Sequence, residues 1–345
     1  MKCSDKGIFF ALKVKSSMPL DSLYWVITHN CNDKCDHCYN ASAPKAVELT
    51  LDEAAQVIEH FPSPQAAPLR IIISGGEPLV NRKLLYACLD GLYERYGDAP
   101  QYMLQTNGDL LTAEILNEIL SHHITRISIA SIDRFHKAKG ERAGVLRTLM
   151  ESRGMIYDEA GALISKERLT ESKLSFSMWG ANEDFWIGGN WPRGRAIENG
   201  LYLKVPAHNF CAIPSGAKGF AGLVGTVQEI AVQLYNLYPC CPGTRMPLAD
   251  LRHENLTDAV EKVTAHPMWQ ALNKGEPSQM GIYKGISEAT ATARITALGN
   301  VCLWCDEFFE KHYEAFVPNT TEPHQNLHHA PSEMFVQISL PETLS

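Results

Sequence analysis

Residues 31–39 read Cys31-Asn-Asp-Lys-Cys35-Asp-His-Cys38-Tyr39, and the spacing of the three cysteines directs the rest of the interpretation. With three residues and then two between them, one short loop can place three thiolates on three corners of a cubane iron–sulfur cluster. Such clusters normally take four cysteine ligands, so a site with three leaves one iron open to a ligand that is not protein. The alternative is a structural zinc ion, which prefers four ligands, and His37 is a candidate fourth.

The cysteine loop follows a segment that predicts a β-strand. Residues 23–28 (Leu-Tyr-Trp-Val-Ile-Thr) are rich in β-branched and aromatic side chains. A metal-binding loop at the C-terminal end of a strand is typical of the active sites of α/β barrels. The sequence therefore places the candidate active site where this first strand ends.

The pattern C-x3-C-x2-C, followed directly by Tyr39, resembles the signature of the radical S-adenosylmethionine (radical SAM) superfamily. Four further segments resemble motifs of that family, in the family's order: Gly75-Gly76-Glu77-Pro78, Thr106-Asn107-Gly108, Ser131-Ile132-Asp133 and Gly194-Arg195-Ala196. The resemblance implies a [4Fe–4S] cluster on the catalytic cysteines Cys31, Cys35 and Cys38. It also implies that S-adenosylmethionine (SAM) is bound by Tyr39, Gly75, Gly76, Glu77, Pro78, Thr106, Asn107, Ser131, Asp133 and Arg195.

Within that resemblance each segment has its own role. Gly75 and Gly76 carry no side chain, so backbone carbonyls can approach a ligand closely. The family uses this segment to bind the amino group of the methionine moiety of SAM. The element that contains Asp133 lies near the ribose in the family, and the arginine matched by Arg195 approaches the SAM carboxylate.

The chain has 345 residues, of which 45% are apolar, enough for one large or two smaller domains. Strand-like and helix-like segments alternate from residue 20 to 206, with helix starts predicted at Thr50, Asn81 and Thr112. Repeating βα units indicate parallel strands with right-handed crossovers, and the resemblance implies a partial, TIM-like (β/α)6 barrel. Between residues 133 and 172 the only candidate for a fifth strand is 154–157, whereas 174–179 is a clear strand.

A second group of cysteines follows residue 206. Cys302-Leu-Trp-Cys305 is a C-x2-C pair able to hold two corners of one cluster. Residues 229–239 alternate as in a strand and run into Tyr238-Pro239-Cys240-Cys241, which resembles the V-Y-P-C strand of the SPASM/Twitch extensions of radical SAM enzymes. The resemblance implies a small α+β, Twitch-like domain with an auxiliary [4Fe–4S] cluster on Cys211, Cys240, Cys302 and Cys305. A zinc site, a set of structural thiols and Cys241 in place of Cys240 remain open alternatives.

These segments divide the chain into an N-terminal extension (1–19), a radical SAM core (20–206), an auxiliary-cluster domain (207–312) and a C-terminal tail (313–345). Ten cysteines, no signal peptide and no run of about eighteen apolar residues indicate a protein of the reducing cytoplasm without a membrane partner. The net charge of −8, without a block of basic residues, argues against a nucleic-acid partner.

The resemblance implies an enzyme that cleaves SAM reductively to a 5′-deoxyadenosyl radical, with flavodoxin or ferredoxin as the type of electron donor. An auxiliary cluster offers an electron acceptor, so we expect an oxidoreductase with net oxidation at a C–H bond. Only about twenty residues precede the core, too few for the leader-binding domain of many peptide-modifying relatives, which favours a sugar, aminocyclitol or nucleoside substrate. The alternatives are a ribosomally made peptide, a redox-neutral decarboxylation or rearrangement, and a SAM-binding regulator without catalysis.

Overall fold

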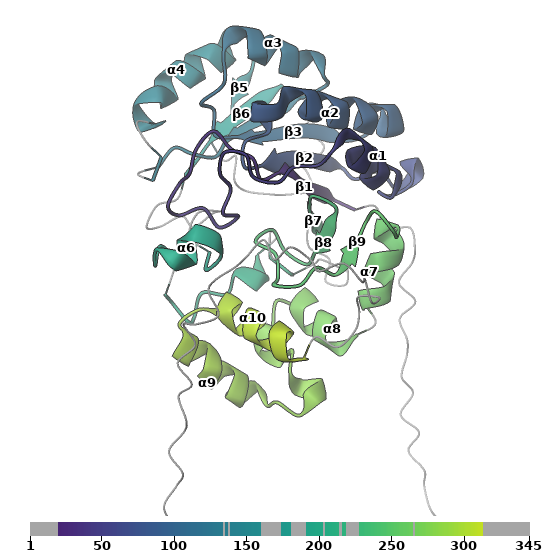
Figure 1. Ribbon diagram of the computed structural model, residues 1–345, viewed down its shortest axis with the longest axis vertical. Coiled ribbons are helices and arrows are strands. Elements are labelled where there is room, and N and C mark those ends of the chain that lie inside the picture. Colours follow the sequence, from purple (N-terminus) through teal and green to yellow (C-terminus); the bar gives the residue numbers. More distant parts are fainter. Residues whose placement is uncertain are drawn as a thin grey trace, which may run out of the picture.

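The computed structural model describes residues 20–133, 135–136, 139–159, 174–180, 191–202, 204–213, 216–218, 228–264 and 266–312. In this part of the chain the strands form one sheet in the order β5-β6-β4-β3-β2-β1-β7-β8-β9 (Figure 1). The strands are β1 (Ser22–Thr28), β2 (Arg70–Gly75), β3 (Gln101–Thr106), β4 (Arg126–Ile129), β5 (Ile156–Tyr157), β6 (Ser175–Met178), β7 (Glu229–Gln233), β8 (Asn236–Tyr238) and β9 (Ala249–Asp250). All neighbouring pairs from β5 to β7 are parallel, and only β8 and β9 run antiparallel to their neighbours. The predicted α/β class with a mostly parallel sheet is confirmed.

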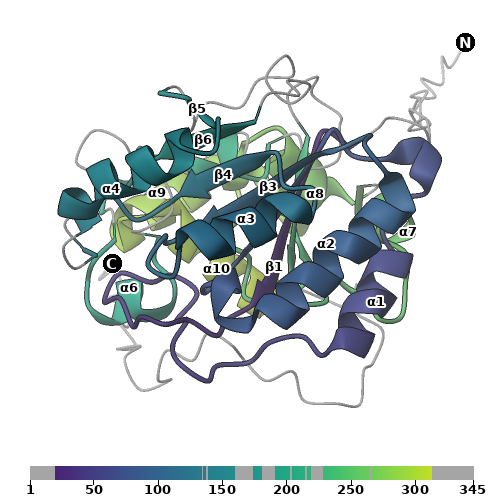
Figure 2. The same ribbon diagram turned by 90° about the horizontal axis from the view of Figure 1, so that it is seen from above.

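The two faces of the sheet carry different side chains because successive residues of a strand point to opposite sides. On β1, Leu23, Trp25 and Ile27 are fully buried in the main apolar core. Helices α1 (Leu51–Glu59), α2 (Arg82–Tyr96), α3 (Ala113–Ser121) and α4 (Lys139–Glu151) cover this face, as Figures 1 and 2 show. The opposite face therefore turns away from these four helices.

The three helix starts expected from the sequence are confirmed. The Thr50 hydroxyl accepts from the Glu53 N–H, and the Glu53 carboxylate accepts from the Thr50 N–H, which completes a capping box at α1. The Asn81 side chain caps α2 by accepting from the Leu84 N–H, and the Thr112 hydroxyl caps α3 by accepting from the Ile115 N–H. Each such cap contributes about 1 kcal/mol to helix stability.

The fifth strand is short, and it does not lie beside β4. Instead β6 pairs with β4, and β5 pairs only with β6, at the edge of the sheet. Side-chain burial explains this order: Phe176 of β6 is 0% exposed and needs cover on both sides, whereas Ile156 of β5 is 55% exposed.

Residues 229–239 form a hairpin rather than the single strand that we expected. Strand β7 pairs in parallel with β1, the chain turns at Leu234 with a φ of 54°, and β8 returns antiparallel to β7. The alternation of side chains continues through such a tight turn, so the sequence pattern does not reveal it. As a result, the sheet includes strands that follow residue 206, where we expected the core to end.

The C-terminal helices lie on the side of the sheet opposite to α1–α4 (Figure 1). They are α6 (Gly194–Glu198), α7 (Leu256–Thr264), α8 (Pro267–Asn273), α9 (Glu288–Leu298) and α10 (Val301–His312). Cys302 and Cys305 lie one turn apart on α10, rather than in a metal-binding knuckle. Among the described helices, none combines the length and the hydropathy that crossing a bilayer requires.

Candidate active site

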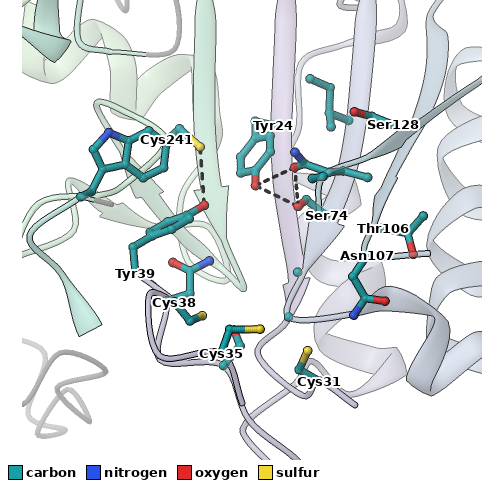
Figure 3. A pocket seen from close by; sticks show the side chains of 18 of the residues that line it. Tyr24, Cys31, Cys35, Cys38, Tyr39, Ser74, Thr106, Asn107, Ser128 and Cys241 are labelled. Carbon is teal, nitrogen blue, oxygen red and sulfur yellow. Dashed lines mark hydrogen bonds between the residues drawn. The ribbon is translucent and has the colours of Figure 1, made fainter. Parts of the chain in front are cut away.

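A cavity of about 220 Å³ runs along the face of the sheet that turns away from α1–α4, here called the inner face. It extends from the cysteine loop to the first residues of β2 and β7 (Figure 3). Ten of the residues expected to form the site line it: Cys31, Cys35, Cys38, Tyr39, Gly75, Gly76, Thr106, Asn107, Asp133 and Arg195. Three others, Glu77, Pro78 and Ser131, are buried outside this lining. Segments more than 150 residues apart in sequence therefore meet at one place.

The three cysteine thiols of the loop point into a common space below the strand ends (Figure 3). Burial raises the pKa of Cys31 to about 12, although the Asp33 N–H stabilises its thiolate, and burial also raises the pKa of Cys35. Without a metal the thiols of Cys31 and Cys35 stay protonated at pH 7, so metal binding must displace their protons.

The spacing of these thiols does not suit a mononuclear zinc site. In a tetrahedral zinc site with Zn–S bonds near 2.3 Å, neighbouring sulfurs lie about 3.8 Å apart. Within the described residues, one set of three candidate ligand atoms lies mutually within 4.8 Å, and it contains none of these thiols. Thiols this far apart are consistent with a larger, polynuclear cluster, which Cys31, Cys35 and Cys38 would hold.

Gly75 and Gly76 are required by the approach of the cysteine loop itself. The Gly76 N–H donates to Thr28 O at 2.7 Å, and the Glu77 N–H donates to Asn30 O at 2.9 Å. A Cβ at Gly75 would lie 2.6 Å from Thr28 O, and one at Gly76 would lie 2.6 Å from Asn30 O. The close backbone approach expected toward a ligand is thus, in this structure, an approach to the end of β1.

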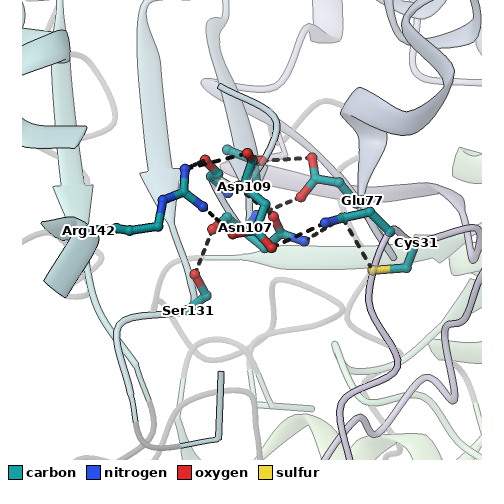
Figure 4. Close-up of polar contacts among 9 residues, drawn as sticks. Cys31, Glu77, Asn107, Asp109, Ser131 and Arg142 are labelled. Atoms are coloured by element: carbon teal, nitrogen blue, oxygen red, sulfur yellow. Dashed lines mark hydrogen bonds and ion pairs between the residues drawn. The ribbon is translucent and has the colours of Figure 1, made fainter. Parts of the chain in front are cut away.

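The Glu77 carboxylate is fully buried and holds the turn that follows β3. It accepts hydrogen bonds from the Thr106 hydroxyl at 2.7 Å, the Asn107 N–H at 2.7 Å and the Leu79 N–H at 3.1 Å. Ser131 donates to Asn107 O at 2.7 Å (Figure 4). Glu77 and Ser131 therefore position the turn that lines the cavity.

The same turn is tied to the cysteine loop. The Asn107 side chain donates to Asn32 Oδ1 at 2.9 Å, and Asn32 donates to Asp109 at 3.2 Å. Arg142 of α4 forms an ion pair with Asp109 and donates to Gly108 O (Figure 4). Asn32, Asp109 and Arg142 were not expected from the sequence, because no motif connects them.

Arg195 clamps the cysteine loop from the far side of the cavity. Its guanidinium donates to Cys35 O at 2.8 Å and to Ser42 O at 2.6 Å, and the backbone N–H of Arg195 donates to Cys38 O at 3.0 Å. The neighbouring Gly194 has a φ of 48°, and a Cβ there would lie 2.5 Å from Tyr39 O. The Gly-Arg-Ala segment thus fits directly against the thiol-bearing loop.

His37 lies with Asp133 and His136, not with the thiols. His136 Nδ1 is 2.7 Å from Asp133 Oδ1, and the His37 and His136 rings meet edge to face at 4.7 Å. Burial, and then the charge of His136, lowers the pKa of His37 to about 4, so this imidazole is neutral at pH 7. The zinc alternative, which needed His37 beside the thiols, is not supported by this arrangement.

The inner face of the sheet presents neutral polar groups to the cavity. The Tyr24 hydroxyl donates to Ser74 Oγ at 2.8 Å, and Ser74 donates to Gln105 Oε1 at 2.9 Å (Figure 3). On the next strands, Trp179 Nε1 donates to Ser128 Oγ at 2.7 Å. These residues alternate with the apolar core residues of the same strands, and that period of two was the signal by which they could have been found.

The cysteines of the second group, Cys211, Cys240, Cys302 and Cys305, lie outside the lining of this cavity. After burial, the charges of Cys211 and Cys302 raise the pKa of Cys240, and those of Cys211 and Cys240 raise the pKa of Cys305, so the four thiols are neighbours. Burial raises the pKa of each of these thiols, to about 12 for Cys211 and about 11 for Cys302. No three of them are close enough together for a tetrahedral zinc site.

Cys241 is turned away from that group and into the cavity wall. Its thiol lies 3.8 Å from the Tyr39 hydroxyl (Figure 3). Burial, and then the charge of Glu229, raises its pKa to about 12. Adjacent cysteines thus face two different sites.

A sequence model of the Radical SAM superfamily matches residues 25–152. This region contains the cysteine loop and the elements that follow strands β1 to β4. The matched residues therefore correspond to a radical SAM domain.

Two curated proteins resemble part of the chain. An AdoMet-dependent heme synthase of Methanosarcina barkeri is 40% identical over 113 residues, which are 32% of this chain and 30% of that protein. A pre-heme d1 synthase of Dinoroseobacter shibae is 35% identical over 74 residues, 21% of this chain and 18% of that protein. The chain thus spans less than a third of the length of either relative.

Solved structures with a similar arrangement include BtrN in complex with AdoMet and 2-DOIA. That alignment covers 80% of this chain and 93% of BtrN, with a TM-score of 0.48 and 16% sequence identity. Another is anSMEcpe with bound AdoMet and a peptide, which covers 82% of this chain and 99% of that chain, with a TM-score of 0.41 and 14% identity.

Proposed function

We propose that this chain is a radical SAM oxidoreductase that oxidises a small polar metabolite. The observation that carries the proposal is the meeting of Cys31, Cys35 and Cys38 with the four motif segments around one cavity. The chemistry that a cluster on these cysteines supplies when bound is reductive cleavage of SAM, and the resulting 5′-deoxyadenosyl radical removes a hydrogen atom from a C–H bond of the substrate. A flavodoxin or ferredoxin would supply the electron.

The residues of the chain have three tasks in this proposal. The cysteine loop offers three thiolates and leaves one iron to SAM. Gly75, Gly76, Asn107 and Asp133 line the space for SAM, and Arg195 holds the loop in shape. Buried neighbours such as Trp191 exclude water from the reacting atoms, which protects a radical from side reactions.

The second group of cysteines supports an auxiliary cluster and, with it, net oxidation. Cys211, Cys240, Cys302 and Cys305 supply four thiols, the usual number for a [4Fe–4S] cluster. The separate placement of Cys241 supports Cys240 as the ligand. A substrate radical formed in the cavity could lose one electron to such a cluster and one proton to solvent or a base. Atoms and charge then balance.

The inner face of the cavity supports the substrate class. Tyr24, Ser74, Gln105 and Ser128 offer neutral hydrogen-bonding groups. The Gln105 carboxamide nitrogen makes no hydrogen bond to the described residues, so it can donate to a substrate oxygen. Such a surface suits the hydroxyl groups of a sugar, aminocyclitol or nucleoside.

The names of the two curated relatives favour a second candidate, a modified haem. A tetrapyrrole carries several carboxylates, which call for free cationic side chains. Of the described lining residues, the arginines are Arg70 and Arg195, and both already hydrogen-bond to protein groups. The lining therefore favours the small polar metabolite over a tetrapyrrole with several carboxylates.

Anaerobic reconstitution tests the proposal. We expect about eight irons per chain, from two cubanes of four, and release of 5′-deoxyadenosine when SAM and dithionite are added. The triple variant with serine at positions 31, 35 and 38 should keep about four irons per chain and release no 5′-deoxyadenosine. A wild-type chain that binds iron but leaves SAM intact would contradict the proposal.

A further inference from the structure

Arg193 is a buried cation near the second group of cysteines. Its side chain is 4% exposed and forms an ion pair with Asp306 at 2.6 Å. It also donates to Gly243 O at 3.2 Å and to Pro192 O at 3.1 Å. Its Nε–H is buried and has no hydrogen-bond partner.

Burial raises the pKa of all four thiols of the group, and the charge of this guanidinium opposes that rise. The interaction is found at Cys211, Cys240, Cys302 and Cys305 alike. A buried charge is costly unless it is paired and hydrogen-bonded. The Asp306 carboxylate balances the charge of Arg193, but the buried Nε–H has no acceptor, which suits a polyanionic group among the four thiols.

We propose that Arg193 raises the reduction potential of the auxiliary cluster and so favours transfer of the substrate radical's electron to it. The inference rests on the auxiliary cluster of the proposed function. Net charge and hydrogen bonds to sulfur are two of the features that tune the potentials of iron–sulfur clusters. A fixed positive charge stabilises the reduced cluster, which is more negative than the oxidised one. Arg193 therefore acts on the cluster and does not contact the substrate.

Asp306 gives this proposal a test of opposite sign. It follows Cys305 on α10 and pairs with the same guanidinium. Removing the arginine charge should make the cluster harder to reduce, whereas removing the aspartate charge should make it easier. A purely structural role for the pair would move both variants in the same direction.

The experiment is a redox titration at pH 8, followed by electron paramagnetic resonance, of reconstituted wild type, Arg193→Gln, Arg193→Lys and Asp306→Asn. For Arg193→Gln we expect the equilibrium constant for reduction of one of the two clusters to fall about tenfold, which is about 59 mV for a one-electron couple. Asp306→Asn should shift the same signal upward, and Arg193→Lys should stay near wild type. Arg252→Gln, which removes an arginine paired with Asp250 instead, should leave both potentials unchanged.

The outcomes separate this inference from the function beneath it. A wild type with about four irons and one cluster signal would show that the auxiliary cluster is absent, so the proposed function would fail in that part. With eight irons present, unchanged potentials in Arg193→Gln and Asp306→Asn would overturn the role of Arg193. Should Arg193→Gln lose its second cluster, Asp306→Asn decides alone: an upward shift supports the role and no shift refutes it.

Discussion

Replacing Glu77 with glutamine should loosen the turn after β3 even when no ligand is present. The carboxylate accepts three hydrogen bonds, from Leu79, Thr106 and Asn107, and it is fully shielded from solvent. A glutamine keeps one acceptor oxygen and turns its NH2 group toward one of these donors. Each hydrogen bond to a charged group contributes about 1.5–3 kcal/mol, so losing one and weakening two should cost about 3 kcal/mol.

That free energy is measurable by native-state hydrogen exchange of the apoprotein. If the turn opens locally, 3 kcal/mol corresponds to exchange about 100-fold faster at the Asn107 amide. Thr106→Val should produce a smaller increase that is not additive with Glu77→Gln, because the two residues share one hydrogen bond. Glu59→Gln, on the exposed face of α1, is the control and should change nothing. Unchanged exchange in Glu77→Gln, together with lost SAM binding, would refute the reasoning and assign the carboxylate to the ligand.

Three further variants address other parts of the chain. Gly194→Ala should lose iron to a chelator faster than wild type, because its positive φ costs about 1–2 kcal/mol and its Cβ would clash with the cysteine loop; Gly144→Ala, with open space around its Cβ, is the matched control. Cys240→Ser should halve the iron content whereas Cys241→Ser should not, and equal losses would contradict the separate placement of the two thiols. Burial, and then the charge of Lys284, lowers the pKa of His266, which caps α8, so the neutral imidazole contributes stability above pH 6.5 and this contribution declines as the pH falls. In urea unfolding between pH 7.5 and 5.5, His266→Asn should reduce the dependence of the unfolding free energy on pH. An unchanged pH dependence would refute this role of His266.

Local chemistry explains why so much of the fold could be predicted. The helix starts at Thr50, Asn81 and Thr112 could be predicted because a cap is a contact between residues three positions apart. The cysteine loop could be recognised for the same reason, since its three thiols lie within eight residues. Signals of this kind need no tertiary information.

What the sequence did not reveal depends on contacts between distant segments. The edge position of β5 and the hairpin at Leu234 follow from pairing within the sheet, which leaves the alternation of side chains unchanged. Likewise, nothing in the sequence around Glu77 shows that its carboxylate turns toward Thr106, 29 positions away. Motifs identify which residues matter, but their tasks are set by neighbours from elsewhere in the chain.

The five residues from Pro192 to Ala196 join two neighbourhoods. Arg195 reaches back to the loop of Cys35, and Arg193 reaches forward to Asp306 on α10. Between them, Gly194 leaves no room for a side chain. The segment works as a splint of fixed length, so adding or deleting a single residue would swing one guanidinium out of its place, and any redesign must satisfy both ends at once.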